Sequence, residues 1–334
     1  MCTLKQSPED FIVDEVMDVR TDGGNMAIVK VKKRETTTFK VVDLLAKSLG
    51  RSTNDIGYAG VKDRNAITTQ YMSIRGAGRK QVDRLSFDKI DVEYLGQADK
   101  PIRRGMHKGN RFTITVRELD HAMRSLEVFP NYFDSQRFSE NNIGIGRSII
   151  KGDFQKAVDL VLSYEGRSHI ERKIEAHLAK HQNDFIGALR RLQRGVVTLY
   201  VGAYQSYLFN RMLADRVREA PHVVVREQFG ELLFPECTSE TTEEGLPLIG
   251  FTTEETEQVR QVCEVEGITT RSFIVRSLPD ASAAGGMRDA WCRLDDLDLS
   301  DFADGVQTAS FFLQKGAYAT MAIRAMCVGN HQQK

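Results

Sequence analysis

The stretch Gly57-Tyr-Ala-Gly-Val-Lys-Asp63-Arg-Asn-Ala-Ile-Thr-Thr-Gln70 decides how the rest of the chain is interpreted. It follows an amphipathic helix pattern over 41–49 and leads into a short strand pattern over 71–74. Its two glycines permit a tight turn or a close approach of two backbone segments. Asp63 stands between two cationic residues and beside an asparagine, so its charge has stabilising groups nearby. On this motif alone a structural role is the better interpretation, because most charged loop residues are only solvated.

Length and composition indicate a soluble globular protein with room for two domains. The chain has 334 residues, of which 41% are hydrophobic and 28% charged. Lys plus Arg and Asp plus Glu both number 46, so any affinity for nucleic acid must be local. No run approaches the roughly 18 apolar residues of a membrane span. The first residues lack the apolar core of a signal peptide. We therefore expect a cytoplasmic protein with no membrane partner.

Neither a metal nor a nucleotide cofactor is indicated. The five cysteines are isolated, which argues against a zinc site and favours a reducing compartment. His177 and His181 lie four residues apart on a polar helix pattern, where a solvated helix is favoured over a metal site for want of further ligands. The glycine pairs in 76–78 and 144–146 fail the dinucleotide fingerprint because each lacks its third glycine. We predict no metal and no cofactor.

The periodicity of apolar residues divides the chain into three regions. Strand patterns dominate the first region, with a turn signal at 22–25 that favours a hairpin. Residues 153–217 are strongly helical, and 221–288 are a shorter α+β pattern with a predicted strand at 272–275. Strand patterns return at 290–294 and 309–313. The middle region is therefore interpreted as an inserted or second domain.

Two glycine-containing segments concentrate positive charge. One, at 75–80, is a turn that leads into a predicted helix. The other, at 100–111, precedes a strand pattern and lacks balancing acids. A basic loop beside a strand can follow RNA phosphates, although a solvated loop is the alternative. The predicted phosphate-contacting residues are Arg75, Arg79, Lys80, Arg103, Arg104, Lys108 and Arg111.

Three places present aromatic side chains that can line a binding site. Residues 131–138 combine aromatic rings, amides and an arginine more densely than a core helix usually does. Phe11 lies in a short strand pattern, and its bland interpretation is an edge-strand residue that covers a core. Tyr318 follows Gly316 and can either stack on a base or be a core tyrosine.

Five separated segments of the sequence resemble the TruD family of pseudouridine synthases, in that family's order. They are Pro8–Phe11, Gly60–Gln70, Arg104–Phe112, Asn131–Phe138 and Gly316–Thr320. The resemblance implies an α+β fold: a catalytic domain over 1–154 and 294–334, whose mixed, mostly antiparallel sheet is flanked by helices. It also implies an inserted α/β TRUD domain over 155–293.

The resemblance implies a function as well. The family isomerises uridine to pseudouridine in tRNA, typically at position 13 of the D-stem, without a cofactor. The motif places the family's nucleophile, which acts on a flipped-out uridine, on Asp63. Whether Asp63 attacks the uracil ring or the ribose C1′ stays open. The family's uridine-binding residues correspond to Phe11, Asn131, Phe133 and Tyr318. Tyr318 replaces a phenylalanine of some relatives, and Ala325 stands where many have an acid, so no role is assigned there.

A nucleophilic aspartate needs a partner that keeps it ionised, because burial disfavours the charged form and a nearby cation restores it. Lys62 is adjacent in sequence, but neighbours in extended backbone point to opposite faces. Arg137 and Lys5 are therefore the candidate partners. We expect a monomer that binds tRNA and needs no obligatory protein partner. The competing hypotheses are an RNA-binding module without catalysis, which could lose Asp63, and a nucleotide-dependent RNA-modifying transferase, which the failed glycine fingerprints disfavour.

Overall fold

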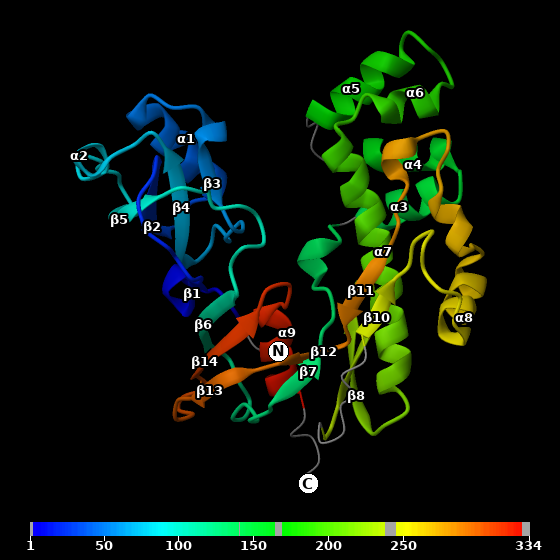
Figure 1. Ribbon diagram of the computed structural model, residues 1–334. Coiled ribbons are helices and arrows are strands. Elements are labelled where there is room, and N and C mark those ends of the chain that lie inside the picture. Colours follow the sequence, from blue (N-terminus) through cyan, green and yellow to red (C-terminus); the bar gives the residue numbers. More distant parts are fainter. Residues whose placement is uncertain (1–2, 140, 164–168, 238–244, 329–334) are drawn as a thin grey trace. The chain divides into compact units, whose positions relative to one another are not determined.

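The protein is represented by a computed structural model that describes residues 3–139, 141–163, 169–237 and 245–328 (Figure 1). Two compact units divide the chain: unit 1 is Met1–Phe129 with Cys292–Lys334, and unit 2 is Pro130–Trp291. The division falls in β7 (Val128–Pro130) and β12 (Trp291–Arg293), two short strands that pair with each other. The boundary of the inserted family domain at 155–293 stays a prediction.

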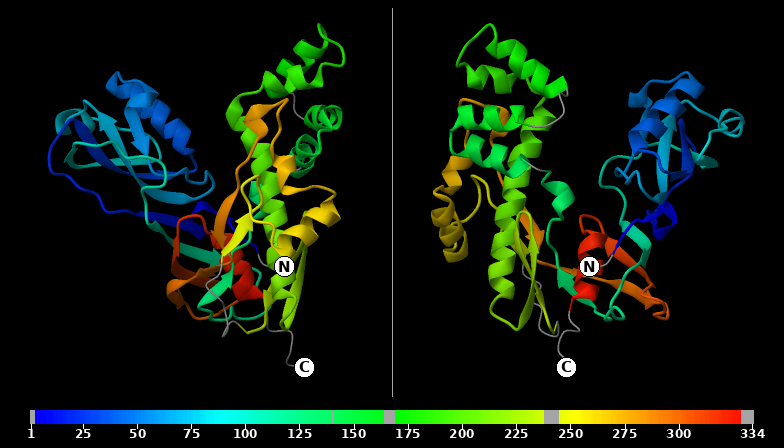
Figure 2. Two further views of the ribbon diagram at one scale, coloured as in Figure 1. Left: turned by 45° about the vertical axis from the view of Figure 1, so that its right-hand side comes forward. Right: turned by 180° about the vertical axis from the view of Figure 1, so that it is seen from behind.

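Unit 1 is built on an eight-stranded sheet of order β13-β14-β6-β1-β4-β2-β5, with β3 paired to β4 (Figures 1 and 2). Its strands are β1 (Phe11–Val16), β2 (Met26–Arg34), β3 (Ile56–Tyr58), β4 (Ile67–Arg75), β5 (Ile90–Ala98), β6 (Gly109–Val116), β13 (Asp295–Leu299) and β14 (Gln307–Gln314). Within the described residues, β1–β4 is the parallel pair and the other pairs of this sheet are antiparallel. The predicted mixed, mostly antiparallel sheet is confirmed.

The pairing of β1, β2 and β4 brings three chain segments together at one end of these strands. Since β1 and β4 run parallel, with Ile12 opposite Ile67, the segments that precede them meet at the same end. Since β2 runs antiparallel to β4, with Arg34 opposite Ile67, the last residues of β2 lie at this end too. Residues around 5, 33 and 63 are thereby collected from distant parts of the sequence.

The α-helices among the described residues of unit 1 are α1 (Thr38–Leu49), α2 (Arg79–Val82) and α9 (Ala319–Cys327). The α1 helix begins at a threonine cap, where the Thr37 hydroxyl accepts a hydrogen bond from Lys40 N, and ends at Gly50 in a left-handed conformation. Its apolar face, which includes Val41 and Leu45, is buried against strands of the sheet. Burial of this face fixes the entry to the 57–70 motif.

Two local predictions in unit 1 are wrong. The turn signal at 22–25 does not close a hairpin, because β1 pairs with β4 and β6 while β2 pairs with β4 and β5. Phe11 does not lie on an edge strand, because β1 is inside the sheet between β6 and β4. In both cases long-range pairing overrides the local signal.

Unit 2 is arranged around the 24-residue helix α7 (Arg194–Val217), the long green helix of Figure 1. The other helices are α3 (Asn142–Ile150), α4 (Phe154–Leu162), α5 (His169–Leu178), α6 (Phe185–Arg190) and α8 (Glu257–Glu266). The strands β8 (His222–Glu227) and β9 (Gly230–Pro235) form one pair, and β10 (Gly245–Leu248) and β11 (Gly286–Asp289) another. α3 approaches α7 so closely that a Cβ on Gly146 would lie 2.2 Å from the carbonyl oxygen of Tyr200.

The strand predicted at 272–275 is a 3₁₀ helix instead, Thr270–Phe273. Here Thr269 N donates a hydrogen bond to the Ser272 hydroxyl, 3.0 Å away. Such short hydroxyl contacts offer the backbone a local alternative to a strand. The strand predicted at 290–294 is confirmed in part, as the short β12.

Candidate active site

The loop 59–66, between β3 and β4, carries Asp63 at the start of β4, beside the start of β1 and the end of β2. The buried ammonium of Lys33, at the end of β2, donates hydrogen bonds to the carbonyl oxygens of Asp63 and Thr36, both at 2.7 Å. The adjoining strand needs glycine, because a Cβ on Gly57 would lie 2.2 Å from the carbonyl oxygen of Ile102. The backbone of Asp63 is therefore anchored from β2, independently of its side chain.

The carboxylate of Asp63 is paired with Lys5. Nζ of Lys5 lies 2.6 Å from Oδ2 of Asp63, and the two side chains are 19% and 46% exposed. The same Nζ lies 4.1 Å from the ring centroid of Phe11, which is buried. Within unit 1, the structure brings the candidate cation Lys5 to Asp63. The carboxylate of Asp63 contacts this cation and, within the same unit, is not buried.

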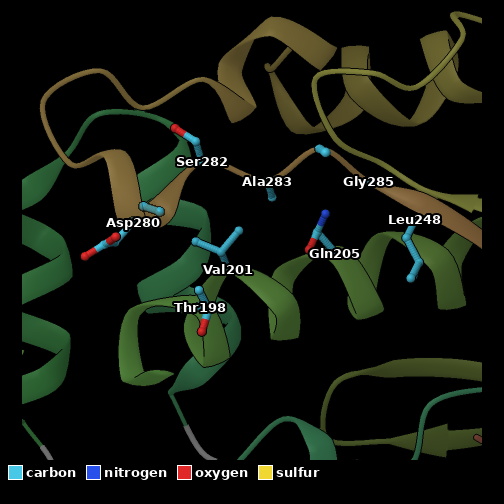
Figure 3. Close-up of a pocket in the computed structure, with 10 residues that line it drawn as sticks. Thr198, Val201, Gln205, Leu248, Asp280, Ser282, Ala283 and Gly285 are labelled. Carbon is cyan, nitrogen blue, oxygen red and sulfur yellow. The ribbon is translucent and has the colours of Figure 1, made fainter. Parts of the chain in front are cut away.

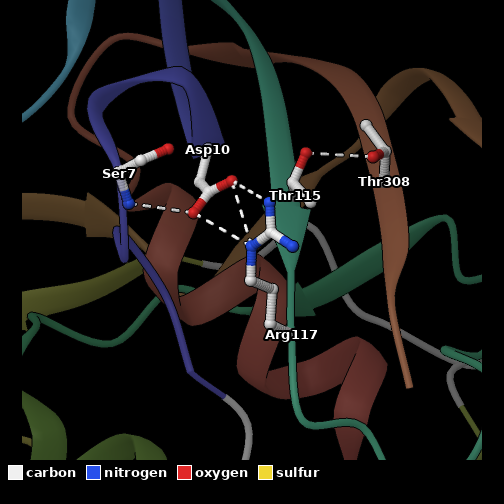
Figure 4. Close-up of polar contacts among 5 residues, drawn as sticks. All are labelled: Ser7, Asp10, Thr115, Arg117 and Thr308. Carbon is white, nitrogen blue, oxygen red and sulfur yellow. Dashed lines mark hydrogen bonds and ion pairs between the residues drawn. The ribbon is translucent and has the colours of Figure 1, made fainter. Parts of the chain in front are cut away.

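Two contacts with Arg117 of the segment after β6 hold the chain on either side of Lys5. Thr3 and Arg117 exchange backbone hydrogen bonds of 2.8 and 3.1 Å. The guanidinium of Arg117 also donates to both oxygens of the buried Asp10, the shortest contact being 2.9 Å, and Ser7 N donates to the same carboxylate (Figure 4). The hydrogen bonds from Arg117 hold the pKa of Asp10 below its ordinary value. This clamp fixes the segment that delivers Lys5 and Phe11.

Lys62 points away from Asp63, as extended backbone predicts. Its ammonium lies 2.9 Å from the carboxylate of Glu15, and donates to Oδ1 of Asn110 at 2.5 Å. Both charged side chains of this pair are buried. The backbone N–H of Lys62 donates to the Thr38 hydroxyl, at 3.0 Å, so α1 also holds the loop. The residue next to Asp63 is thus an internal anchor for the motif.

Lys33 has unusual surroundings for a lysine. It is 1% exposed, and in the described part of the chain no carboxylate lies within ion-pair distance of its ammonium. Burial lowers the pKa of Lys33 to about 8; the charge of Asp63 opposes this shift and that of Lys62 adds to it. A buried lysine bonded to two carbonyls is costly, and here it ties two loops beside Asp63.

We predict a pH-dependent stability from Lys33, tested against Lys33→Met. In the unfolded chain a lysine titrates near 10.5, whereas the pKa of Lys33 in the folded protein is about 8. Between these values the unfolded chain holds more protons, so the free energy of unfolding rises with pH. Relative to the variant, the wild-type protein should gain on the order of 3 kcal/mol from pH 7.5 to 10.5. Urea unfolding at both pH values measures this gain, and parallel curves for the two proteins would contradict it.

Unit 2 contains a second cluster, around Asn131 and Phe133. Arg288 of β11 donates to Oδ1 of Asn131 at 2.7 Å and to its carbonyl oxygen at 3.1 Å. The guanidinium carbon of Arg288 lies 4.1 Å from the ring centroid of Phe133. Asn210 of α7 exchanges hydrogen bonds with the backbone of Phe133, at 2.8 and 2.9 Å. The two predicted uridine-binding residues of this segment are therefore held together by one arginine.

Two further predicted site residues lie elsewhere. Arg137, also in unit 2, packs against α7, where a Cβ on Gly202 would lie 2.7 Å from its guanidinium nitrogen. A pairing of Arg137 with Asp63 stays a prediction. Tyr318 is half-buried in unit 1 and precedes α9, with its carbonyl oxygen accepting a hydrogen bond from Met321 N. Its contact with a uridine likewise stays a prediction.

Four of the predicted phosphate-contacting residues have carboxylate partners. Arg75 lies 3.8 Å from Asp55, Arg79 lies 3.9 Å from Asp83, Lys108 lies 2.8 Å from Asp18, and Arg111 lies 2.6 Å from Asp296. Asp55 is half-buried and the other seven side chains are exposed, and such surface pairs contribute only about 0–1 kcal/mol each. The remaining predicted residues, Lys80, Arg103 and Arg104, are exposed.

One hollow in unit 2 does not suit an anionic substrate. The hollow of about 270 Å³ in Figure 3 lies between α7, which supplies Val201 and Gln205, and the segment that includes Asp280 and Gly285. No cationic residue lines it, and Asp280 brings a negative charge. Across the described ranges, no group of three potential metal ligands occurs. Nor does any helix there have the length and apolarity to cross a membrane.

Sequence reasoning missed two anchors of the candidate site. Lys33 lies near the end of β2 between the exposed Lys32 and Arg34, so the composition of this segment does not show that its side chain turns inward. Arg288 comes from a glycine-flanked segment with no motif. The strand alternation could have suggested Lys33, whereas only the fold reveals Arg288.

Comparison with known proteins gives a consistent result. The sequence matches the family described as tRNA pseudouridine synthase D (TruD) over residues 1–169, 163–244 and 222–326. A "Probable tRNA pseudouridine synthase D" of Methanopyrus kandleri is 30% identical, with 91% of this chain and 86% of that protein covered. A protein of the same name from Nanoarchaeum equitans is 26% identical, with 97% and 98% covered. In fold, the chain is similar to a crystal structure from Methanosarcina mazei that bears the TruD name, with a TM-score of 0.74, 24% identity, and 98% and 93% of the two chains covered.

Proposed function

Because this chain belongs to the TruD family of tRNA pseudouridine synthases, we propose that it isomerises uridine to pseudouridine in tRNA, at position 13 of the D-stem, with Asp63 as nucleophile. One observation supports the role of Asp63 above all: its carboxylate is paired with Lys5, whose ammonium rests on Phe11. A nucleophile must be aimed at the reacting atoms, and this contact fixes the direction of the carboxylate.

The reaction breaks the C–N glycosidic bond, rotates the uracil and forms a C–C bond to C5. It requires no net redox change and no transferred group, so the side chains named here suffice without a cofactor. Asp63 supplies the electron pair, either to the uracil ring or to the ribose C1′, and is released when the new bond forms. The hydrogen at C5 of the base is then lost to solvent as a proton, and N1 of the base takes up a proton in its place.

The target base must leave its stack before it can react. Extrusion of a base costs a few kcal/mol, and stacking on an aromatic ring returns roughly 1–3 kcal/mol. Phe133 and Tyr318 are proposed to provide such stacking, and Asn131 to bond a uracil edge. The ring of Phe11 already carries the ammonium of Lys5, so Phe11 is proposed to act first by positioning that lysine.

Arg288 is proposed as a positioning residue for this recognition. Arg288→Lys keeps the charge but loses the forked contact with Asn131 and the flat contact with Phe133. We expect kcat to fall about tenfold, with the affinity for tRNA unchanged. Single-turnover rates and equilibrium binding measure the two effects. A variant that turns over at the wild-type rate would remove Arg288 from the site.

A cytoplasmic monomer is proposed, with tRNA as its partner. The test of the function uses two transcripts of one tRNA labelled with tritium at C5 of uridine, one with uridine and one with cytidine at position 13. The metal-stripped protein, without nucleotide, should release tritium from position 13 of the first transcript only. Equal release from both would reject the position. Binding without any release would favour an RNA-binding module, and release that required an added nucleotide would favour a transferase.

A further inference from the structure

A hollow of about 390 Å³ in unit 2, lined by residues of α5 and of the segments that follow α5 and α6, gathers positive charge. We call it the α5–α6 hollow. Its polar lining consists of Lys173, His177, Lys180, His181 and Arg191. No acidic residue belongs to this lining. Since the chain as a whole has no net charge, this concentration is a local feature.

His177 organises the hollow. The side chain is 8% exposed, and its Nε2 lies 2.9 Å from Oδ2 of Asp184. Its Nδ1 accepts a hydrogen bond from Nε of Arg191, 3.3 Å away. A nitrogen that accepts such a bond carries no proton, so this contact fits the neutral imidazole with its proton on Nε2. The ring of His181 lies beside it, with the centroids 4.8 Å apart.

The same contacts leave His177, one of the histidine pair that the sequence singled out, without a free nitrogen for a metal. Both nitrogens of His177 are engaged, one with a carboxylate and one with a guanidinium. A guanidinium held beside the ring would also repel a cation. The hollow is therefore suited to an anion.

The cations of the hollow lack the partners that other surface cations have. In the parts of the chain that are described, no carboxylate lies within ion-pair distance of Lys173, Lys180 or Arg191. Arg111 and Lys108, which the sequence suggested as phosphate contacts, do have such partners. Like charges gathered in one hollow repel each other, and an anion that binds among them relieves this repulsion.

We propose that the α5–α6 hollow binds a phosphodiester group of the RNA backbone, in addition to the residues proposed to bind the uridine. The guanidinium of Arg191 suits two oxygens of one phosphate, and the two ammonium groups act as point charges around it. Such a contact positions an RNA without reading its sequence. That the RNA is a tRNA rests on the proposed function.

The test compares two double variants of the full-length protein in equilibrium binding to a tRNA transcript over a range of KCl concentrations. Lys173→Gln/Lys180→Gln removes two charges from the hollow. Lys40→Gln/Lys47→Gln removes two from the exposed face of α1 and matches the change in net charge. The first variant should lower the slope of log K against log salt by about 1.8 and weaken binding by about tenfold at 0.15 M salt. The control should keep the wild-type slope.

A wild-type slope in the first variant, or an equal loss in both variants, would overturn the proposal. Binding of inorganic phosphate by the wild-type protein but not by the first variant, with no change in the salt slope for tRNA, would overturn it too, because the site would then serve a small anion. Unchanged thermal unfolding of the variants excludes a folding defect. Binding is read without turnover, so failure of the proposed isomerisation leaves this result interpretable, and normal isomerisation with an unchanged slope rejects the α5–α6 site alone.

Discussion

Asp63→Asn should abolish pseudouridine formation while leaving tRNA binding intact. The amide keeps the shape of the side chain but cannot act as the nucleophile, and removal of a nucleophile commonly costs about 10⁴-fold or more in rate. The loop should keep its place, since its backbone is held by Lys33 and by the contact of Lys62 with Thr38. Single-turnover release of C5 tritium measures the chemical step, and filter binding measures affinity.

The matched control for Asp63→Asn is Asp43→Asn, an exposed aspartate of α1. It should leave both quantities at the wild-type value. If Asp63→Asn kept more than about 10⁻³ of the wild-type rate, another group would have to be the nucleophile.

Lys5→Met should lower the single-turnover rate about 10- to 100-fold with little effect on tRNA affinity. The ammonium of Lys5 is already engaged with Asp63 at 2.6 Å and with the ring of Phe11, so its loss releases the carboxylate from its aimed position. Methionine retains the length of the side chain and its packing on the ring.

Two further lysine variants make this second prediction more specific. Lys5→Arg restores a cation and should recover part of the rate, which a purely structural role would not require. Lys32→Met, on the exposed side of β2, should behave as wild type. A Lys5→Met protein that reacts at the wild-type rate, or that loses affinity and rate in equal measure, would contradict the positioning role.

The sequence predicted the elements of unit 1 well wherever local pattern and tertiary pairing agree. The helix predicted over 41–49 is found within α1, and the strands predicted at 71–74 and 309–313 are found within β4 and β14. Predictions failed where distant segments compete. The glycine turn at 22–25 resembles a hairpin, yet β1 is taken up by β4 and β6.

Predictions for the candidate site likewise succeeded where local patterns were enough and failed where long-range pairing decides. The motif identified Asp63, and the rule that adjacent side chains diverge correctly removed Lys62 as its partner. The meeting of Lys5 with Asp63 depends on the parallel register of β1 and β4, which no local pattern encodes. Arg288 could not be predicted for a similar reason, because β11 places it beside Asn131 from 157 residues away.

The measurement that tests the central claim most directly is a search for capture of Asp63 by hydroxylamine during turnover. Attack by the carboxylate on either the ring or C1′ creates an ester, which hydroxylamine converts to a hydroxamate on the same residue. The carboxylate is 46% exposed within its unit, which leaves access for a small amine. Mass spectrometry of the peptide that spans 57–70 should find the hydroxamate on Asp63 only when tRNA is present. Conversion of the tRNA under these conditions with Asp63 unmodified would contradict the account.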